Sequence, residues 1–293
     1  MKKQFAIVLC LILLCTALTG CSKEVAVDVS GLTQITLSGN TTAVTGQSYT
    51  ATLIPAKNFE LPKTITVTVD GAALTEGYTY DPATGALTVE AGSVTGSLAI
   101  SGTATESIVG KWEATKDMTA MFNDYITKAD PTTAKYFNFT NLTLDMTMEF
   151  TAEGTCKIEF SQDSFTTFIQ AVTEGTIAGM NKMLEDMLAS QNINLTVEQF
   201  LAFTGVSMED MIKEAMSSVK PEEMLGELTG TSNYKVEDGK LYTSENAAST
   251  DYKDVNPYTV KDGVLTIEGI LGDSEQAEAL KYFFPLTLNR VVE

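Results

Sequence analysis

The chain has no histidine, and it contains one tryptophan, Trp112, and one arginine, Arg290. Without an imidazole group there is no Ser-His-Asp or Cys-His catalytic centre and no zinc site with histidine ligands. No other combination of acid, base and nucleophile stands out, and no calcium-binding loop motif is present. We therefore expect a protein that is not an enzyme and that needs no cofactor and no metal ion.

Basic residues are scarce as well. The 293 residues include 19 Lys and Arg against 38 Asp and Glu, so the formal net charge is −19. Such an acidic surface repels phosphate backbones, and we expect no nucleic-acid partner. Hydrophobic residues make up 44% of the chain, and the length suits two domains that each bury a core.

The start of the chain has the pattern of an export signal. Lys2 and Lys3 precede an apolar run over residues 5–18, which is too short for an ordinary membrane-spanning helix. The letters LTGC at 18–21 then resemble the lipobox of bacterial lipoproteins. The resemblance implies a signal peptide over residues 1–20, acylation of Cys21, and a lipid-anchored protein on the extracytoplasmic face of a bacterial cell membrane. A plain secretory signal is the alternative.

The remaining cysteines exclude an internal disulfide in such a mature chain. Cys10 and Cys15 lie in the predicted signal peptide, and Cys21 would carry the lipid, so Cys156 is the only thiol left. Cys156 falls on the apolar face of a predicted strand, which is typical of an inert core residue.

The first predicted domain follows a predicted tether over residues 21–31. From 32 to 105 the chain is rich in Thr, Val and Gly and alternates as strands do, as in TITVTV at 64–69. The run ending in YDPATGALTVEAGSVTGSLAISGTA resembles one copy of an immunoglobulin-like repeat of bacterial cell-surface proteins. That resemblance implies a small β-sandwich that acts as a spacer or as an adhesive module.

The second predicted domain spans residues 107–293. It contains a pattern of apolar residues at helical spacing over 162–228, which predicts a helical insertion. Eight predicted strands flank it, at 108–115, 142–150, 154–160, 231–237, 240–245, 256–261, 264–269 and 284–291. Eight antiparallel strands in hairpin order can close as a barrel. The expected fold is therefore mainly β: a sandwich followed by an eight-stranded barrel with a helical insertion.

Trp112 lies on the first of these strands, within the letters GKW at 110–112. This resembles the G-x-W motif of the lipocalin-like (calycin) barrels, in which an arginine of the last strand packs across the tryptophan and closes one end. Arg290 is on the last predicted strand. Gly110, Trp112 and Arg290 are thus expected to close the barrel, with a cation–π contact between the last two. The alternative is a generic core tryptophan and a solvated terminal arginine.

A lipocalin-like barrel implies an interior that could bind a small apolar or amphipathic ligand. The residues expected to line it are Leu144, Met146, Met148, Ile158, Phe160, Leu265, Ile267, Leu286 and Leu288. Methionines of the insertion, such as Met180, Met183 and Met187, would form either ordinary core or an adaptable lid. The alternative function is a structural or adhesive cell-surface protein with a filled barrel, with a surface protein or glycan as its partner.

Overall fold

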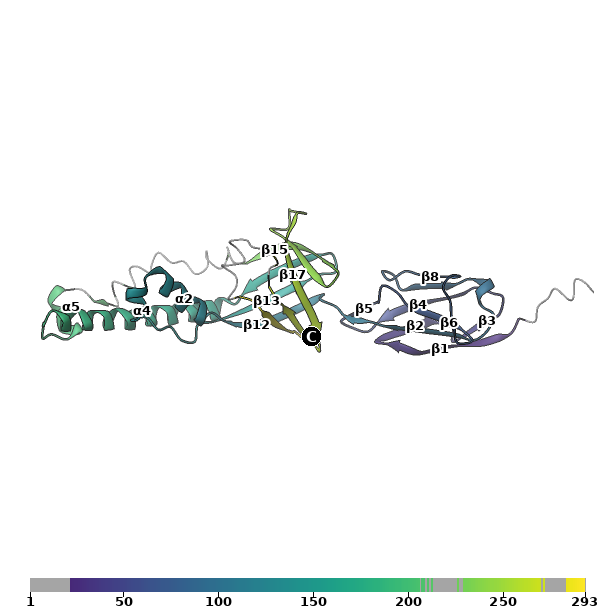
Figure 1. The fold of residues 1–293 in the computed structure, drawn as a ribbon, viewed down its shortest axis with the longest axis horizontal. Coiled ribbons are helices and arrows are strands. Elements are labelled where there is room, and N and C mark those ends of the chain that lie inside the picture. Colours follow the sequence, from purple (N-terminus) through teal and green to yellow (C-terminus); the bar gives the residue numbers. More distant parts are fainter. Residues whose placement is uncertain are drawn as a thin grey trace, which may run out of the picture. The chain divides into compact units, whose positions relative to one another are not determined.

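The computed structural model describes residues 22–205, 229–269 and 283–292, with a few single positions between these ranges. It divides into two compact units, Met1–Ser107 and Ile108–Glu293 (Figure 1). Both predicted parts of the mainly β fold are confirmed, since the first unit contains sandwich-like sheets and the second contains a closed eight-stranded barrel.

The first unit is built from two main sheets, of order β3-β1-β10-β6-β7 and β2-β4-β9-β8, and a short β11-β5 pair. The strands are β1 (Glu24–Thr33), β2 (Ile35–Gly39), β3 (Thr42–Val44), β4 (Tyr49–Pro55), β5 (Phe59–Glu60), β6 (Thr66–Val69), β7 (Ala72–Ala73), β8 (Tyr78–Tyr80), β9 (Ala86–Val89), β10 (Leu98–Thr103) and β11 (Thr105–Glu106), with a 3₁₀ turn at Ala91–Ser93. Alternation places Val67 and Val69 of β6 in the core, together with Leu53 and Leu87.

The predicted turn at 81–85 is present and is held by Asp81. Its carboxylate accepts hydrogen bonds from the Ala83 amide at 3.0 Å and from the Thr84 hydroxyl at 2.7 Å. Gly85 has a φ of +74°, and a Cβ there would lie 2.0 Å from the Leu53 carbonyl oxygen. Only glycine fits this position, because it combines a left-handed backbone with a close backbone approach.

The prediction of a tether over residues 21–31 is wrong for its described part. Glu24–Thr33 forms β1, which pairs parallel to β10 and antiparallel to β3. Its side chains are mostly exposed and only Val27 is fully buried, so the segment looks polar in sequence. Its main partner, β10, comes from the far end of the unit, and short-range patterns do not reveal such a pairing.

The barrel strands follow one another around the barrel in chain order, each antiparallel to the next. They are β12 (Gly110–Asp117), β13 (Thr143–Phe150), β14 (Thr155–Phe160), β15 (Gly230–Glu237), β16 (Lys240–Ser244), β17 (Tyr252–Lys261), β18 (Val264–Ile267) and β19 (Leu286–Arg290). β19 pairs with β12 and closes the barrel, with Arg290 directly opposite Trp112. The Asp-Gly turns at 238–239 and 262–263 have positive φ at both residues, which favours tight two-residue hairpins.

Four described helices lie between barrel strands. α4 (Gln162–Ser190) and α5 (Val197–Thr204) follow β14, as predicted, and most of residues 206–228 lie outside the described residues. α5 begins at a capping box made by Thr196 and Gln199. α2 (Thr119–Ala129) and α3 (Pro131–Ala134), between β12 and β13, were not predicted. Figure 1 shows α4 running outward from the barrel, with α2 beside its first half.

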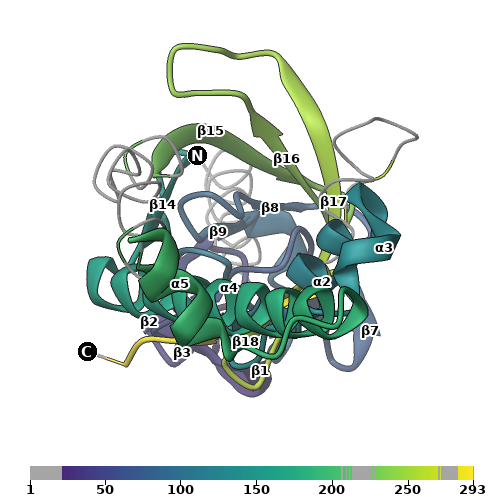
Figure 2. The same ribbon diagram turned by 90° about the vertical axis from the view of Figure 1, so that its left-hand side faces the viewer.

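α2 lies beside α4 (Figure 2). Aromatic side chains of α2 and of the segment after α3 pack against α4. Phe122 of α2 meets the ring of Phe168 of α4 at a centroid distance of 5.4 Å. α4 carries glycines at 175 and 179, where a Cβ would lie 2.7 Å from the ring of Phe139 and 2.3 Å from the ring of Phe137. The two glycines therefore let these stacked rings lie directly on the helix backbone.

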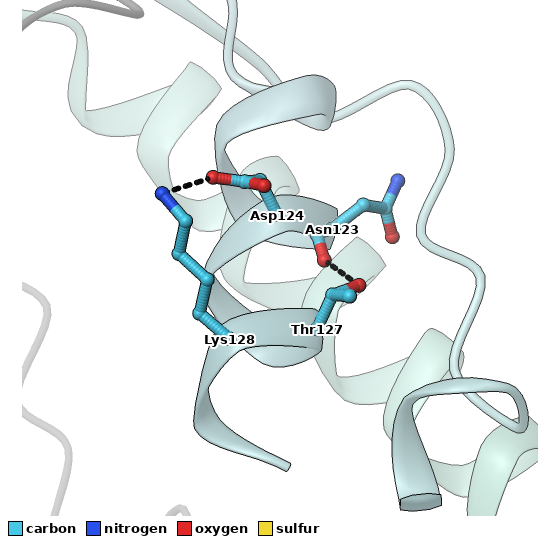
Figure 3. A network of polar contacts seen from close by, with 4 residues as sticks. All are labelled: Asn123, Asp124, Thr127 and Lys128. Atoms are coloured by element: carbon cyan, nitrogen blue, oxygen red, sulfur yellow. Dashed lines mark hydrogen bonds and ion pairs between the residues drawn. The ribbon is translucent and has the colours of Figure 1, made fainter. Parts of the chain in front are cut away.

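Polar contacts of Asn123 also hold α2 to the segment after α3. The Asn123 side chain donates to the Phe139 carbonyl and accepts from the Phe139 amide, both at 3.0 Å. One turn on, the Thr127 hydroxyl donates to the Asn123 carbonyl at 2.7 Å, and Lys128 pairs with Asp124 at 2.9 Å (Figure 3). The exposed ion pair adds little stability, whereas the Asn123 bonds satisfy the backbone of a half-buried segment.

Candidate ligand site in the barrel

Trp112 and Arg290 pack against each other towards one end of the barrel. The Arg290 guanidinium carbon lies 4.1 Å from the centre of the indole, and its Nη1 donates to the Val109 carbonyl at 2.8 Å. The indole Nε1 donates to the Ile108 carbonyl at 2.7 Å, and Trp112 is fully buried. The cation–π contact expected from the sequence is therefore present, and the indole Nε1 and the Arg290 Nη1 each donate to a backbone carbonyl.

Gly110 is needed at this closed end for its lack of a side chain. Its φ is +133°, and a Cβ there would lie 2.7 Å from Arg290 Nη1. Any other residue would be strained and would also push the guanidinium away from the indole. This explains in physical terms why the glycine, the tryptophan and the arginine occur together.

The half of the barrel next to Trp112, called the closed half, is filled with side chains. Phe150, Leu241, Leu265 and Leu288 are all at most 1% exposed. The Tyr234 ring packs edge-on against Phe150 at 5.0 Å. Cys156 is buried in the same cluster, and this burial raises the pKa of its thiol to about 12. The thiol is therefore protonated and unreactive at neutral pH.

The nine residues predicted to line the interior all have inward positions. Eight of them belong to one apolar cluster: Met146, Met148, Ile158, Phe160, Leu265, Ile267, Leu286 and Leu288. Leu144 instead packs with Phe165 of α4, in a cluster that also includes Met118 and Ile169. The first turns of α4 thus lie against the end of the barrel opposite Trp112.

In the half farther from Trp112, called the open half, Leu144 and Ile267 are buried, but several other apolar side chains are only partly buried. Phe160, Tyr258, Phe283 and Phe284 pack against the interior cluster but keep part of their surface exposed. The barrel therefore differs between its ends: buried rings and aliphatic groups fill the closed half, and accessible apolar surface remains in the open half.

Asn256 places a polar group on the inner side of β17. It has the same orientation as Tyr258 and Val260, two members of the interior cluster, and lies opposite Leu241. Asn256 is 6% exposed, and its Oδ1 is buried without a hydrogen-bond partner in the described part of the chain. An unpaired buried amide oxygen costs about 1–3 kcal/mol, so a group that donates a hydrogen bond to it would be bound favourably.

Lys116 is a second inward polar residue of the barrel, and it lies in the open half. It shares the face of Trp112 and Ala114 on β12 and lies opposite Leu144. Its Nζ is 3.4 Å from the Pro285 carbonyl oxygen and 5.9 Å from the centre of the Phe283 ring. Partial burial lowers the pKa of the ammonium group, while the neighbouring Asp117 opposes that shift.

Two surface hollows lie outside the barrel interior. One, of about 630 Å³, follows the outer face of β12, β13 and β14, where Glu113, Asp145 and Glu159 reach solvent. The other, of about 450 Å³, lies along α4 and includes Met183 and Met187. Met180 and Met183 are half-buried and Met187 is 38% exposed. Met183 and Met187 line the second hollow, and none of the three belongs to the interior cluster of the barrel.

Sequence reasoning missed both inward polar residues of the barrel. Lys116 stands two residues after Ala114 on the strand that carries Trp112, and Asn256 stands two residues before Tyr258. Neither residue was predicted to face the interior. Strict alternation along each strand would have assigned both to the inner face. The nine predicted lining residues are all apolar, and a prediction restricted to apolar residues leaves out Lys116 and Asn256.

Cys21 lies outside the described residues. No described helix is long and apolar enough to cross a membrane. Within the described ranges, no three acidic or cysteine side chains gather closely enough to hold a metal ion. Comparisons of the chain with protein-family models, with curated proteins and with solved structures found no match.

Proposed function

We propose that this is a lipid-anchored extracytoplasmic protein that is not an enzyme, in which an immunoglobulin-like spacer displays a lipocalin-like barrel. In this proposal the open half of the barrel binds a small amphipathic molecule. The LTGC motif and Cys21 support the anchor, and the sandwich-like sheets of the first unit support the spacer.

The observation that carries the binding function is Asn256. Cores rarely retain an unpaired buried amide, because an apolar residue of similar size avoids the cost of its desolvation. Here the amide faces the barrel interior, on the strand that also presents partly exposed Tyr258. A ligand with an apolar body beside the rings of the open half and a donor group at Oδ1 would satisfy both features.

The alternative is a structural or adhesive surface protein whose barrel is a packed scaffold. The filled closed half favours it, because Trp112, Phe150, Leu265 and Leu288 leave no exposed surface there. In that case a water molecule would satisfy Asn256, and the helices that extend from the barrel would carry any contact with a partner.

Calorimetric titration separates the two functions. The mature chain with serine in place of Cys21 is titrated with 1-dodecanol below its solubility limit, because this molecule offers an apolar chain and a hydroxyl donor. Saturable binding with one molecule per chain is the result that we expect. Absence of binding to dodecanol and to a panel of other single-chain amphiphiles would contradict the binding function and favour the packed scaffold.

A further inference from the structure

The far end of the helical insertion carries a surface that the proposed ligand site does not use. We propose that the hollow along α4, together with the exposed apolar residues that follow this helix, is the contact through which two copies of the chain form a two-fold symmetric dimer. In this dimer, Lys135 of each copy faces Asp186 of the other. The inference goes beyond the proposed function and does not depend on a ligand in the barrel.

The first argument is the apolar surface at this end of α4, which Figure 1 shows away from the barrel strands. Three apolar side chains from the last turns of α4 line the hollow of about 450 Å³: Met183, Leu184 and Met187. After the helix, Ile193 and Leu195 are 36% and 44% exposed. The Ile193 amide donates to the Leu188 carbonyl at 2.9 Å, which holds this connection against the end of the helix. Exposed apolar side chains around a hollow with polar residues at its rim mark a contact with another molecule.

The second argument is that the hollow and side chains suited to fill it belong to the same surface. A two-fold axis beside the hollow brings Ile193 and Leu195 of one copy to the hollow of the other and repeats the contact in reverse. Met183 and Met187 are unbranched and flexible, so they adapt to the side chains that enter. One surface thus offers both the depression and the projecting groups that a self-complementary contact requires.

The third argument is the charge at the rim of the hollow. Lys135 and Asp186 both line the hollow, and both are exposed. The Lys135 Nζ lies 4.6 Å from the centre of the Tyr136 ring. Its hydrogen bond to Tyr136 and, to a smaller degree, the charge of Asp186 raise the pKa of Lys135, which is therefore charged at neutral pH. A two-fold rotation brings the cation of each copy to the anion of the other, whereas a rim of one sign would repel a second copy.

The overall charge of the chain decides between occupants. An anionic membrane surface repels a protein with a formal net charge of −19. The same charge opposes self-association at long range, but at about 0.15 M salt the Debye length is only about 8 Å. Under these conditions the short-range contacts at the hollow determine whether two copies associate.

Sedimentation equilibrium of the mature chain with serine in place of Cys21 tests the proposal. We expect the average mass to rise from that of a monomer towards that of a dimer at concentrations up to about 0.5 mM, because a small contact gives a transient dimer. Met187→Gln and Leu195→Ser each remove apolar contact from both halves of the interface. Each should weaken the dimer by about tenfold or more.

Charge reversal tests the two-fold pairing. Lys135→Glu and Asp186→Lys each place like charges opposite one another, and each alone should weaken the dimer by about tenfold. Mixed in equal amounts, these two variants have opposite charges at both contacts, so the mixture should dimerise within about twofold of the unaltered chain. Lys111→Glu and Glu149→Lys change the net charge by the same amounts on the exposed outer face of the barrel, and they should leave the dimer unchanged.

Circular dichroism and thermal unfolding establish that each variant is folded. A chain that stays monomeric at about 0.5 mM overturns the proposal and leaves the hollow to a different protein. A dimer that the apolar variants do not weaken, or that the control variants weaken equally, also overturns it. If the mixture of Lys135→Glu and Asp186→Lys associates no better than either variant alone, the two-fold pairing is wrong.

Discussion

Replacing Arg290 by methionine tests how the barrel is closed. Methionine keeps an apolar stem beside the indole but removes the guanidinium. The variant loses a cation–π contact at 4.1 Å and a charged hydrogen bond of 2.8 Å to the Val109 carbonyl. A partly buried cation–π contact contributes about 1 kcal/mol, and a hydrogen bond to a charged group contributes about 1.5–3 kcal/mol. We therefore expect the free energy of unfolding to fall by about 3 kcal/mol.

The fluorescence of Trp112 provides a specific assay, because this is the only tryptophan in the chain and it lies in the barrel unit. Unfolding in guanidinium chloride, followed by this emission, reports the stability of the barrel alone. The native emission should also move to longer wavelength as water reaches the indole. Lys261→Met, which removes an exposed cation at the end of β17, is the matched control. A loss below about 0.5 kcal/mol, equal to that of the control and with unchanged emission, would refute the reasoning.

Two other predictions concern Cys156 and Gly179. Burial raises the pKa of the Cys156 thiol to about 12 from a usual value of 9.0. The mature chain with serine in place of Cys21, in which Cys156 is the only thiol, should therefore not react with Ellman's reagent at pH 8, and rapid reaction without denaturant would contradict the burial of Cys156. The folded state holds the thiol proton more tightly than the unfolded state, so the contribution of Cys156 to stability is complete below about pH 9. From there towards pH 12 this contribution should decline by up to about 1.4 kcal/mol per pH unit. Comparing the pH dependence of unfolding with that of Cys156→Ala measures the decline. Helix propensity alone would make Gly179→Ala stabilising by about 1 kcal/mol, yet a Cβ there would lie 2.3 Å from the Phe137 ring, so we expect a net loss of about 1–2 kcal/mol in chemical denaturation. A net gain would show that Phe137 moves away without cost.

Local patterns were sufficient to predict the barrel strands. Alternation in segments such as LTLDMTMEF, together with the Asp-Gly turns, defines hairpins between neighbours in the sequence. A barrel with strands in chain order needs little more than such hairpins and one closing pair. Trp112 and Arg290 indicated that pair, and they lie opposite each other in the structure.

Elements whose packing depends on segments far along the chain could not be predicted from local sequence patterns. β1 looked like a tether because its principal partner, β10, is far along the chain. α2 was missed because only Met118, Phe122 and Ile126 form its apolar stripe, and these pack against Phe139 and Phe168 from later segments. Asn256 and Lys116 lie at positions that alternation assigns to the inner face, but which polar groups lack partners depends on the assembled barrel.

The position of the ligand is the most direct test of the central claim, and nuclear magnetic resonance can measure it. During a titration of the mature, Cys21→Ser chain with 1-dodecanol, the side-chain amide signal of Asn256 and the single indole N–H signal of Trp112 are followed together. The account predicts that the Asn256 signal shifts with saturation and shows contacts to the alkyl chain, while the Trp112 signal stays in place because it lies in the closed half. Saturable binding that leaves the Asn256 signal unchanged, or no binding at all, would contradict it.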